Sequence, residues 1–454
     1  MAIIKNPLTL VKQEGGGQQP IINKDTMFYA RVVDFKNNIL KEQWLNDGET
    51  FILPEPLVYE GLVFDGWSSS SQLTETTING KTQYSIVIHK DLMAGTLYHT
   101  SSGNDELDIE LTSITGLDVD INVKNATIYW GDGTSDTVSY SPINFTHTYE
   151  NYGKYTIYIN YSDNSSTFNF NLNSNFQMSF ILKNFRASER PTFPSIESSY
   201  NMEYLCVSKN SGTIGTMRNC FNLKTLILPP NQINSPNILG SKIINYVIPY
   251  NVASLNFIQQ TSIDFLCIPN NITTLMFNLA TELCSLYRIS LPTSLTTYQN
   301  SFNYCRGLSG KIIFPNSMTT ISGNLQYLTN DVIIIANHNI SLPSSHLQNS
   351  TGLIEFQQNN TTDIQINSSV FSSCSNLLKV KFGPVSSIAS NAFAYCSKCQ
   401  FFDFTECTSI PTLANANAFN GTNANSKILV PSSLYNQWIT ETNWSSLASR
   451  IVAV

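Results

Sequence analysis

One pattern, a short apolar strand closed by proline, recurs as Leu226-Ile227-Leu228-Pro229, Tyr246-Val247-Ile248-Pro249, Leu266-Cys267-Ile268-Pro269, Ile289-Ser290-Leu291-Pro292 and Ile312-Ile313-Phe314-Pro315. The prolines are spaced by 20, 20, 23 and 23 residues, a period typical of solenoids built from stacked strand-turn units. One such unit cannot bury its own apolar face, whereas stacked units bury a continuous core. Proline lacks the N–H that would continue a strand ladder, so it marks where each strand ends. The pattern predicts a β-solenoid over the larger half of the chain.

An aromatic residue and a cysteine recur at a fixed place beside these strands, in Phe302-x-x-Cys305, Phe371-x-x-Cys374 and Phe393-x-x-Cys396. Residues at a constant phase of a solenoid occupy equivalent positions in successive units. Because Phe and free Cys are both commonly buried, we expect these side chains to fill the core.

The composition argues against charged partners. Of the 454 residues only 13% are charged, and the net charge is −7, so the sequence carries no electrostatic footprint for nucleic acid or for an anionic membrane surface. The polar surface comes instead from Asn, Ser and Thr, which suit turn-rich β structure because they hydrogen-bond the local backbone.

The nine cysteines are interpreted as free buried thiols, although disulfides stay open if the protein works outside a cell. The pair Cys396-x-x-Cys399 has the spacing of a metal or redox site, but no second pair accompanies it and Cys396 belongs to the repeat phase. We therefore expect no metal site. The cysteines are Cys206, Cys220, Cys267, Cys284, Cys305, Cys374, Cys396, Cys399 and Cys407.

The first 26 residues are expected to form an arm and linker. Gly15-Gly16-Gly17 cannot pack and should be flexible, so the preceding peptide is either a frayed end or an anchor that orders on a partner. The arm shows no apolar run followed by a small-residue cleavage site, and the chain has no apolar stretch of about 18 residues that could span a bilayer. We expect no export signal and no membrane insertion.

Residues 27–100 resemble an internalin-type B-repeat followed by a connector. The resemblance rests on a strand at 29–35, a turn at Gly48 and the closing motif Gly61-Leu62-Val63-Phe64-Asp65-Gly66-Trp67. It implies a small β-grasp-like module that acts as a spacer or weak binding unit. Residues 72–100 are expected to be the connector, packed on a neighbour, with His89 and His99 as ordinary surface or interface histidines.

Residues 101–172 resemble a PKD domain, which implies an immunoglobulin-like β-sandwich. The motifs are Trp130-Gly131-Asp132-Gly133 and, later, His147-x-Tyr149-x-x-x-Gly153-x-Tyr155. Trp130 should fill the sandwich core and Asp132-Gly133 should turn a hairpin. Asp132 and His147 could be taken for an acid–base couple, but in this family both serve the fold.

The acidic side chains of the first sandwich strand are expected to lie along a solvated face instead of binding calcium. They belong to Asp105, Glu106, Asp108 and Glu110.

Residues 173–427 resemble a BspA-like leucine-rich repeat solenoid, most clearly at Leu377-Leu378-Lys379-Val380-Lys381-Phe382 with Ala392-Phe393-Ala394-Tyr395-Cys396. The stretch from 173 to about 200 should cap its N-terminal end, because an open end exposes strand edges. Residues 428–454 should form the C-terminal cap, with Leu434, Tyr435, Trp438 and Trp444 as its apolar part.

The sequence predicts a mainly β protein: a small β-grasp-like module, an Ig-like sandwich, a leucine-rich-repeat solenoid and a cap. Because no nucleophile–base pair, paired carboxylates or metal cluster is signalled, we expect no catalytic residue, cofactor or enzyme activity. Two binding functions compete. The first is a bacteriophage virion protein (head fibre, tail fibre or decoration protein) held to other virion proteins by the arm and binding a bacterial-surface or mucosal glycan or protein. The second is a bacterial cell-surface adhesin. The absent export signal favours the virion, homo-oligomerisation stays open, and no ligand-binding residue can be named.

Overall fold

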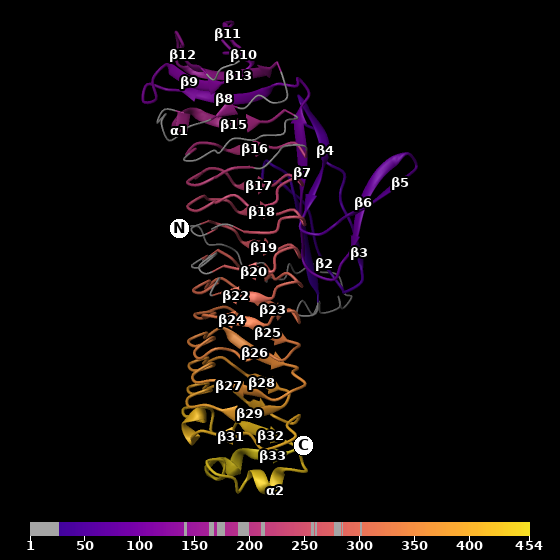
Figure 1. Cartoon of the computed structure of the whole chain (residues 1–454), viewed down its shortest axis with the longest axis vertical. Coiled ribbons are helices and arrows are strands. Elements are labelled where there is room, and N and C mark those ends of the chain that lie inside the picture. Colours follow the sequence, from indigo (N-terminus) through magenta and orange to yellow (C-terminus); the bar gives the residue numbers. More distant parts are fainter. Residues whose placement is uncertain are drawn as a thin grey trace, which may run out of the picture.

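The computed structural model describes residues 27–139, 143–162, 168–169, 178–188, 199–209, 214–255, 258, 261–276, 283, 285–299 and 302–454. The predicted arm, its glycine run and Cys284 lie outside these residues. Figure 1 shows a long rod of stacked coils with a β-sandwich at one end, and a further β module lying along the flank of the rod. The predicted mainly β fold with a solenoid is confirmed.

The proline-closed segments form one face of the solenoid, as predicted. Each strand pairs in parallel with the next, in one sheet of order β17-β18-β19-β21 and a second of order β23-β25-β26-β28-β30-β32-β33. After each of the five proline-closed segments the proline carbonyl accepts a turn hydrogen bond, for example from Ile272 N to Pro269 O at 3.2 Å. The bounds are β17 Thr225–Ile227, β18 Asn245–Val247, β19 Phe265–Cys267, β21 Arg288–Ser290, β23 Gly310–Phe314, β25 Val332–Ala336, β26 Leu353–Gln358, β28 Lys379–Phe382 and β30 Phe401–Asp403.

A second face of the solenoid carries shorter parallel strands, which are not apolar enough to be recognised from the hydropathy of the sequence. They form the sheets β20-β22-β24 and β27-β29-β31. Three of them begin at or beside a Thr-Thr pair a fixed distance after the proline, and Thr296 N donates to Thr273 O of the preceding coil at 2.8 Å. β-Branched threonine suits short strands, so the signal was present in the sequence. The bounds are β20 Thr274–Leu275, β22 Thr297–Gln299, β24 Thr320–Ser322, β27 Ile364–Ile366, β29 Val385–Ile388 and β31 Thr412–Leu413.

The Phe-x-x-Cys residues point inward, as predicted. Phe371 and Phe393 stack with ring centroids 5.4 Å apart, and Phe393 stacks in turn on Phe419 at 5.3 Å. Cys374 and Cys396 are fully buried beside them. In these later coils the core therefore contains a column of stacked aromatic rings with buried thiols beside it.

Residues 105–169 form two antiparallel sheets, and Trp130 is fully buried between them. This matches the predicted sandwich, while its PKD identity stays a prediction. One sheet has the order β12-β9-β14, and in the other β11, β10, β13 and β8 are neighbours. The bounds are β8 Asp105–Leu111, β9 Asp118–Val123, β10 Ala126–Tyr129, β11 Ser135–Val138, β12 Ile143–Thr148, β13 Gly153–Tyr161 and β14 Phe168–Asn169.

The sandwich and the solenoid share a sheet. After the one-turn helix α1 (Met178–Ile181), β15 (Leu182–Arg186) pairs antiparallel with β8, and β16 (Tyr204–Cys206) pairs in parallel with β15. Strand pairing thus runs across the predicted boundary at residue 172. The sandwich itself covers the first strand edge of the solenoid, a role expected of residues 173–200 alone.

At the other end, residues 427–454 add β32 (Lys427–Val430), the short helices α2 (Tyr435–Trp438) and η3 (Ser445–Arg450), and the final strand β33 (Ile451–Ala453). Another 3₁₀ turn, η2 (Ala416–Phe419), precedes them. Trp438 and Trp444 are fully buried with ring centroids 5.4 Å apart, as the predicted apolar cap requires.

Residues 28–100 form two sheets, and β7 lies in the middle of the larger one. That sheet has the order β2-β1-β7-β4 and the smaller has the order β3-β6-β5. Residues 92–100 are therefore not a connector but the most buried strand of the module. The bounds are β1 Phe28–Val33, β2 Ile39–Leu45, β3 Thr50–Ile52, β4 Leu62–Ser69, β5 Thr74–Ile78, β6 Lys81–Val87 and β7 Leu92–Thr100.

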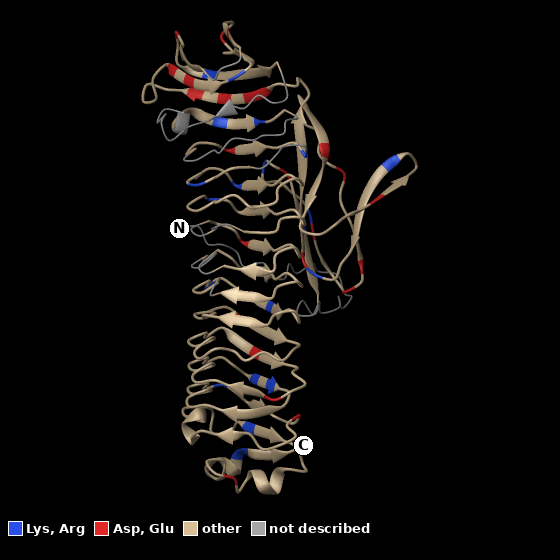
Figure 2. Cartoon of the chain, viewed as in Figure 1, with Lys and Arg blue, Asp and Glu red and all other residues tan. Residues whose placement is uncertain are grey.

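Charged residues are unevenly placed along the rod. Figure 2 shows acidic residues gathered on the sandwich strands, while the solenoid coils carry isolated charges. The surface of the solenoid is thus mostly polar and uncharged, as the composition predicts.

Candidate binding cleft and the seam that holds it

A cleft of about 550 Å³ opens between the two sheets of the N-terminal module. The sheets pack together around Phe51, Ile88 and Leu92, which are buried. Further along they separate, because the β5–β6 hairpin stands away from the rest of the molecule (Figure 1). The space between β4 and this hairpin is the cleft.

A β-bulge places two aromatic side chains on the same wall. Phe64 and Trp67 are three residues apart, so in a regular strand they would face opposite sides. The pairing of β4 with β7 skips Asp65, with Phe64 opposite Tyr98 and Gly66 opposite Leu97, and this extra residue restores Phe64 and Trp67 to one face. Gly66 permits the bulge with a φ of 137°. Both rings line the cleft, 5.5 Å apart.

The opposite wall is the hairpin. Asn79 and Gly80 both have positive φ, 52° and 78°, the two-residue turn that suits a right-twisted hairpin. Tyr84 and Ile78 line the cleft from this side. Burial, and then the neighbouring Glu75 carboxylate, raise the pKa of Tyr84, so its phenol is a neutral hydrogen-bonding group.

The charged groups around the cleft are already paired. Lys81 Nζ lies 3.2 Å from the Glu55 carboxylate at the exposed rim. Asp65 accepts hydrogen bonds from Ser208 Oγ at 2.6 Å and from Lys209 N at 2.8 Å, both on the solenoid. The bulge that forms the aromatic wall is thus tied directly to the rod.

We call the contact between β1 and β7 of this module and the outer face of the solenoid the seam. Its apolar part brings Met93 and Leu97 together with Ile227, Val247 and Cys267. Gly95 lies so close that a Cβ there would come within 2.7 Å of Ile227 Cδ1. The module is therefore packed on successive coils of the rod.

Buried charge fixes the same seam. Arg31 donates to Asp264 Oδ1 at 2.8 Å, to Asn245 Oδ1 at 3.1 Å and to the Tyr287 hydroxyl at 3.1 Å. Burial opposes the guanidinium charge, but the Asp264 carboxylate together with Tyr287 and Tyr29 outweighs it, so the pKa of Arg31 is raised. Arg31 is 5% exposed and the Asp264 side chain is 30% exposed, so the guanidinium end of this contact is held away from water.

A second ion pair lies nearby. Arg288 donates through both Nε and a terminal nitrogen to the two oxygens of Asp91, each at 2.8 Å. The side chains are 8% and 5% exposed, and the guanidinium lies over the Trp44 ring at 4.7 Å from its centroid. Asp91 also accepts from Tyr29 N at 2.7 Å. Because these buried charges are paired, they hold the module against the coils of the solenoid in a single register.

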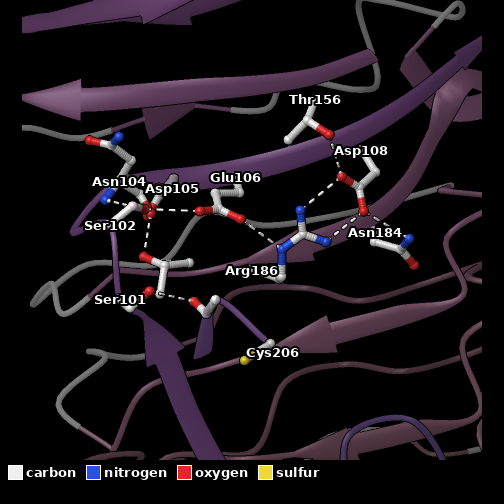
Figure 3. A network of polar contacts seen from close by, with 12 residues as sticks. Ser101, Ser102, Asn104, Asp105, Glu106, Asp108, Thr156, Asn184, Arg186 and Cys206 are labelled. Atoms are coloured by element: carbon white, nitrogen blue, oxygen red, sulfur yellow. Dashed lines mark hydrogen bonds and ion pairs between the residues drawn. The ribbon is translucent and has the colours of Figure 1, made fainter. Parts of the chain in front are cut away.

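The acidic strand of the sandwich is paired, which corrects the expectation of a solvated face. Arg186 of β15 donates to Glu106 Oε2 at 2.9 Å and to both oxygens of Asp108 at 2.5 and 2.8 Å (Figure 3). Lys183 lies 3.1 Å from Glu110. Burial works against the charge of Asp108, but Arg186 prevails and lowers its pKa. Asp105, on the other face, is buried and accepts from Ser188 N and Oγ. These ion pairs and hydrogen bonds between β8 and the β15 segment join the sandwich to the first coil.

Asp132 and His147 do meet, with Nε2 2.7 Å from Oδ2. The imidazole stacks on Trp130 at 4.6 Å, and Thr134 also donates to Asp132. Burial favours protonation, but the hydrogen bonds from Thr134 and His147 hold the pKa of Asp132 at about 2. The pair braces the β10–β11 hairpin, consistent with the structural role predicted.

The two histidines expected to be ordinary surface or interface residues each lie beside an aspartate. His89 is exposed beside Asp47, and His99 Nδ1 is 3.7 Å from Asp65.

The cysteines in the described residues are free and buried, as interpreted, including Cys396 and Cys399. Burial raises the pKa of the Cys374 thiol to about 12 and that of Cys399 to about 12. Within the described ranges, no three His, Cys, Asp or Glu side chains gather as metal ligands. No helix there is long and apolar enough to cross a membrane.

No family model and no curated protein matches the chain. Among solved structures it is similar to a leucine-rich repeat protein from Bacteroides ovatus, at 15% identity and a TM-score of 0.28, over 72% of this chain and 98% of that one. It is also similar to a leucine-rich cell surface protein from Faecalibacterium prausnitzii, at 14% identity and a TM-score of 0.24, over 56% of this chain and 92% of that one. Both TM-scores are low, so the fold assignment rests on the strand pairing described above.

Proposed function

We propose that the chain is a non-enzymatic binding protein of a bacterial cell surface, in which the solenoid is a rod and the flanking module presents the binding cleft. The observation that carries the proposal is the seam. Buried ion pairs such as Asp91–Arg288 hold the module against the coils, and Asp65 ties the aromatic wall of the cleft to Ser208, just after β16. The rod and the cleft are thereby fixed to each other, as a protein that holds a ligand at a distance from its attachment point requires.

The bacterial surface is the location that the repeats favour. The strand-and-Phe-x-x-Cys pattern resembles BspA-like repeats, which are typical of bacterial surface proteins, and the internalin-type and PKD-like modules are of the same extracellular kind. The virion alternative gains no support from the fold or from the matched structures. The mostly uncharged solenoid surface agrees with a spacer instead of a partner for nucleic acid.

The location is tested on intact cells of the source bacterium. Antibody raised against the solenoid should label unpermeabilised cells, and mild protease treatment of those cells should release fragments of the chain. Mass spectrometry of purified phage particles from the same source tests the alternative location, the virion. Finding the chain in particles and not on cells would reject the proposed location.

The adhesive function is tested with beads that carry the purified chain. They should attach to host tissue or mucus more than beads carrying a variant lacking residues 27–100. Equal attachment of the two bead types would show that the module presents no binding site.

A further inference from the structure

We propose that the cleft between β4 and the β5–β6 hairpin binds a segment of an uncharged glycan chain. This inference rests on the proposed binding function and names the site and the class of ligand. The cleft, at about 550 Å³, falls in the range of about 300 to 1,000 Å³ that ligand pockets occupy. A second hollow, within the solenoid, has about 10 Å³ and would barely admit one water molecule.

The walls of the cleft suit sugar rings. Phe64 and Trp67 lie on one side and Tyr84 on the other, with Pro54 and Pro56 between them. Phe64 and Tyr84 are half-buried, so part of each ring faces the open space. An aromatic ring offers a flat apolar face that packs against the C–H face of a pyranose, and the phenol of Tyr84 can also hydrogen-bond a sugar hydroxyl.

The polar lining suits hydroxyl groups. Thr82 lines the cleft on the same face of β6 as Tyr84, since β6 pairs with β5 without a bulge, and its hydroxyl makes no hydrogen bond with the rest of the described chain. A hydroxyl both donates and accepts, which matches the mixed donors and acceptors of a sugar. Ligands of this kind are oriented by a few such groups in a largely apolar pocket.

The charges disfavour an anionic ligand. The lining holds one cation, Lys81, and two carboxylates, Glu55 beside it at the exposed rim and Asp65, whose side chain is 6% exposed. The charges of the lining therefore sum to −1, and because exposed ion pairs contribute little free energy, an acidic sugar, a phosphate or an acidic peptide would meet this net negative charge and gain little from Lys81. An uncharged glycan meets no such penalty.

The shape suits the middle of a chain. The hairpin projects from the rest of the molecule (Figure 1), and the residues of β5 are exposed throughout. No described part of the chain packs against the outside of the hairpin, so a glycan bound in the cleft can extend past its tip. Because such single sites bind weakly, many copies on one surface would supply avidity.

The test is a binding measurement on the full chain. Probes are uncharged hexasaccharides of β-1,4-glucose, α-1,4-glucose and β-1,4-N-acetylglucosamine, with oligogalacturonate as the charged comparison and an unrelated extended peptide as the other class. We expect at least one uncharged probe to bind by titration calorimetry, and its entry to change the fluorescence of Trp67.

Tyr84→Ala should weaken that binding about tenfold or more, and Thr82→Val, a milder change on the same face of β6, should weaken it several-fold. Tyr152→Ala removes an exposed tyrosine of the sandwich and should leave the affinity unchanged. Circular dichroism of each variant checks that the module stays folded.

Binding of an uncharged probe that neither Tyr84→Ala nor Thr82→Val affects would overturn the assignment of the cleft while leaving the adhesive function standing. Binding of oligogalacturonate or the peptide in the cleft, with no uncharged probe bound, would overturn the ligand class. Failure of every probe would overturn the glycan proposal, whereas the bead experiment would still report on adhesion.

Discussion

Asp91→Asn should loosen the N-terminal module from the solenoid. The substitution removes the charge opposite Arg288 but keeps a side chain of the same shape. Both partners are nearly inaccessible, at 8% and 5% exposure, so the guanidinium is left in the seam without a counter-charge. Removing one member of such a buried pair costs about 3–5 kcal/mol, and Asn retains one acceptor, so the lower end, about 3 kcal/mol, is expected.

The assay is native-state hydrogen exchange, because it reports the local opening of the module from the solenoid separately from the unfolding of the rest of the chain. Amides of β1 and β7 should exchange about 100-fold faster in the variant, the factor to which 3 kcal/mol corresponds. Glu55→Gln is the matched control. Its partner Lys81 lies 3.2 Å away, but the two side chains are 82% and 77% exposed, and such pairs contribute about 0–1 kcal/mol. Equal protection of β7 in the two variants would refute the reasoning and leave apolar packing as the source of the seam's strength.

Three further changes have expected outcomes. A Cβ at position 95 would lie only 2.7 Å from Ile227 Cδ1, so Gly95→Val should lower the stability of the seam by about 1–3 kcal/mol and expose the module to limited proteolysis. Acidification should destabilise the solenoid through His346, whose pKa burial lowers from 6.5 to about 4. The unfolded state then takes up the proton first, so the contribution of His346 to the free energy of unfolding is full above pH 6.5, has fallen by about 2 kcal/mol at pH 5 and is largely lost below pH 4. Denaturant unfolding across this range measures that loss. Phe393→Ala, between two stacked rings, should cost about 3–5 kcal/mol in thermal or denaturant unfolding.

Each of these has a matched control. Adding Ile227→Ala should relieve Gly95→Val, and a failure of that rescue would contradict a direct clash. His346→Gln should flatten the acid dependence while His89→Gln, at an exposed histidine, should not. Phe401→Ala, at a ring 40% exposed on the rod, should cost well under the core substitution.

The solenoid could be predicted because its signal is local and repeated. Proline after each apolar triplet fixed the main row of strands to within a residue or two, from β17 to β23. The Thr273-Thr274 type of pair, which begins the second row, recurs at the same phase but is too short and too polar to stand out by hydropathy. Two residues of strand give little periodicity to detect.

The sequence of each strand also indicates which coils are covered. Leu226-Ile227-Leu228 is apolar without alternation, and both of its faces are buried, one in the core and one in the seam. Lys379-Val380-Lys381-Phe382 alternates, and its outer face meets solvent. The contrast could have shown that something lies over the earlier coils, and the unbroken run Leu92–Leu97 could have identified β7 as the strand that covers them.

The residues that meet across the seam could not be predicted. Arg31 and Asp264 are separated by 233 residues, and nothing in either neighbourhood names the other. The cleft was equally out of reach, because it depends on a bulge at Asp65 and on the divergence of two sheets, not on a motif. The motif Phe-x-Gly-Trp predicts two apolar side chains for the core of a small module, whereas in the structure both rings line one wall of the cleft.

The course of β7 has a mechanical consequence. Tension along the rod acts in the direction of the hydrogen bonds between coils, which would break coil by coil from a free end. β7 runs lengthwise across the coils of β16, β17, β18 and β19 and touches each of them (Figure 1). Because β7 is one covalent strand that contacts all four coils, no two of them can separate unless at least one detaches from β7. Under load the coils that β7 does not cross should therefore separate first, while the region that carries the cleft keeps its shape.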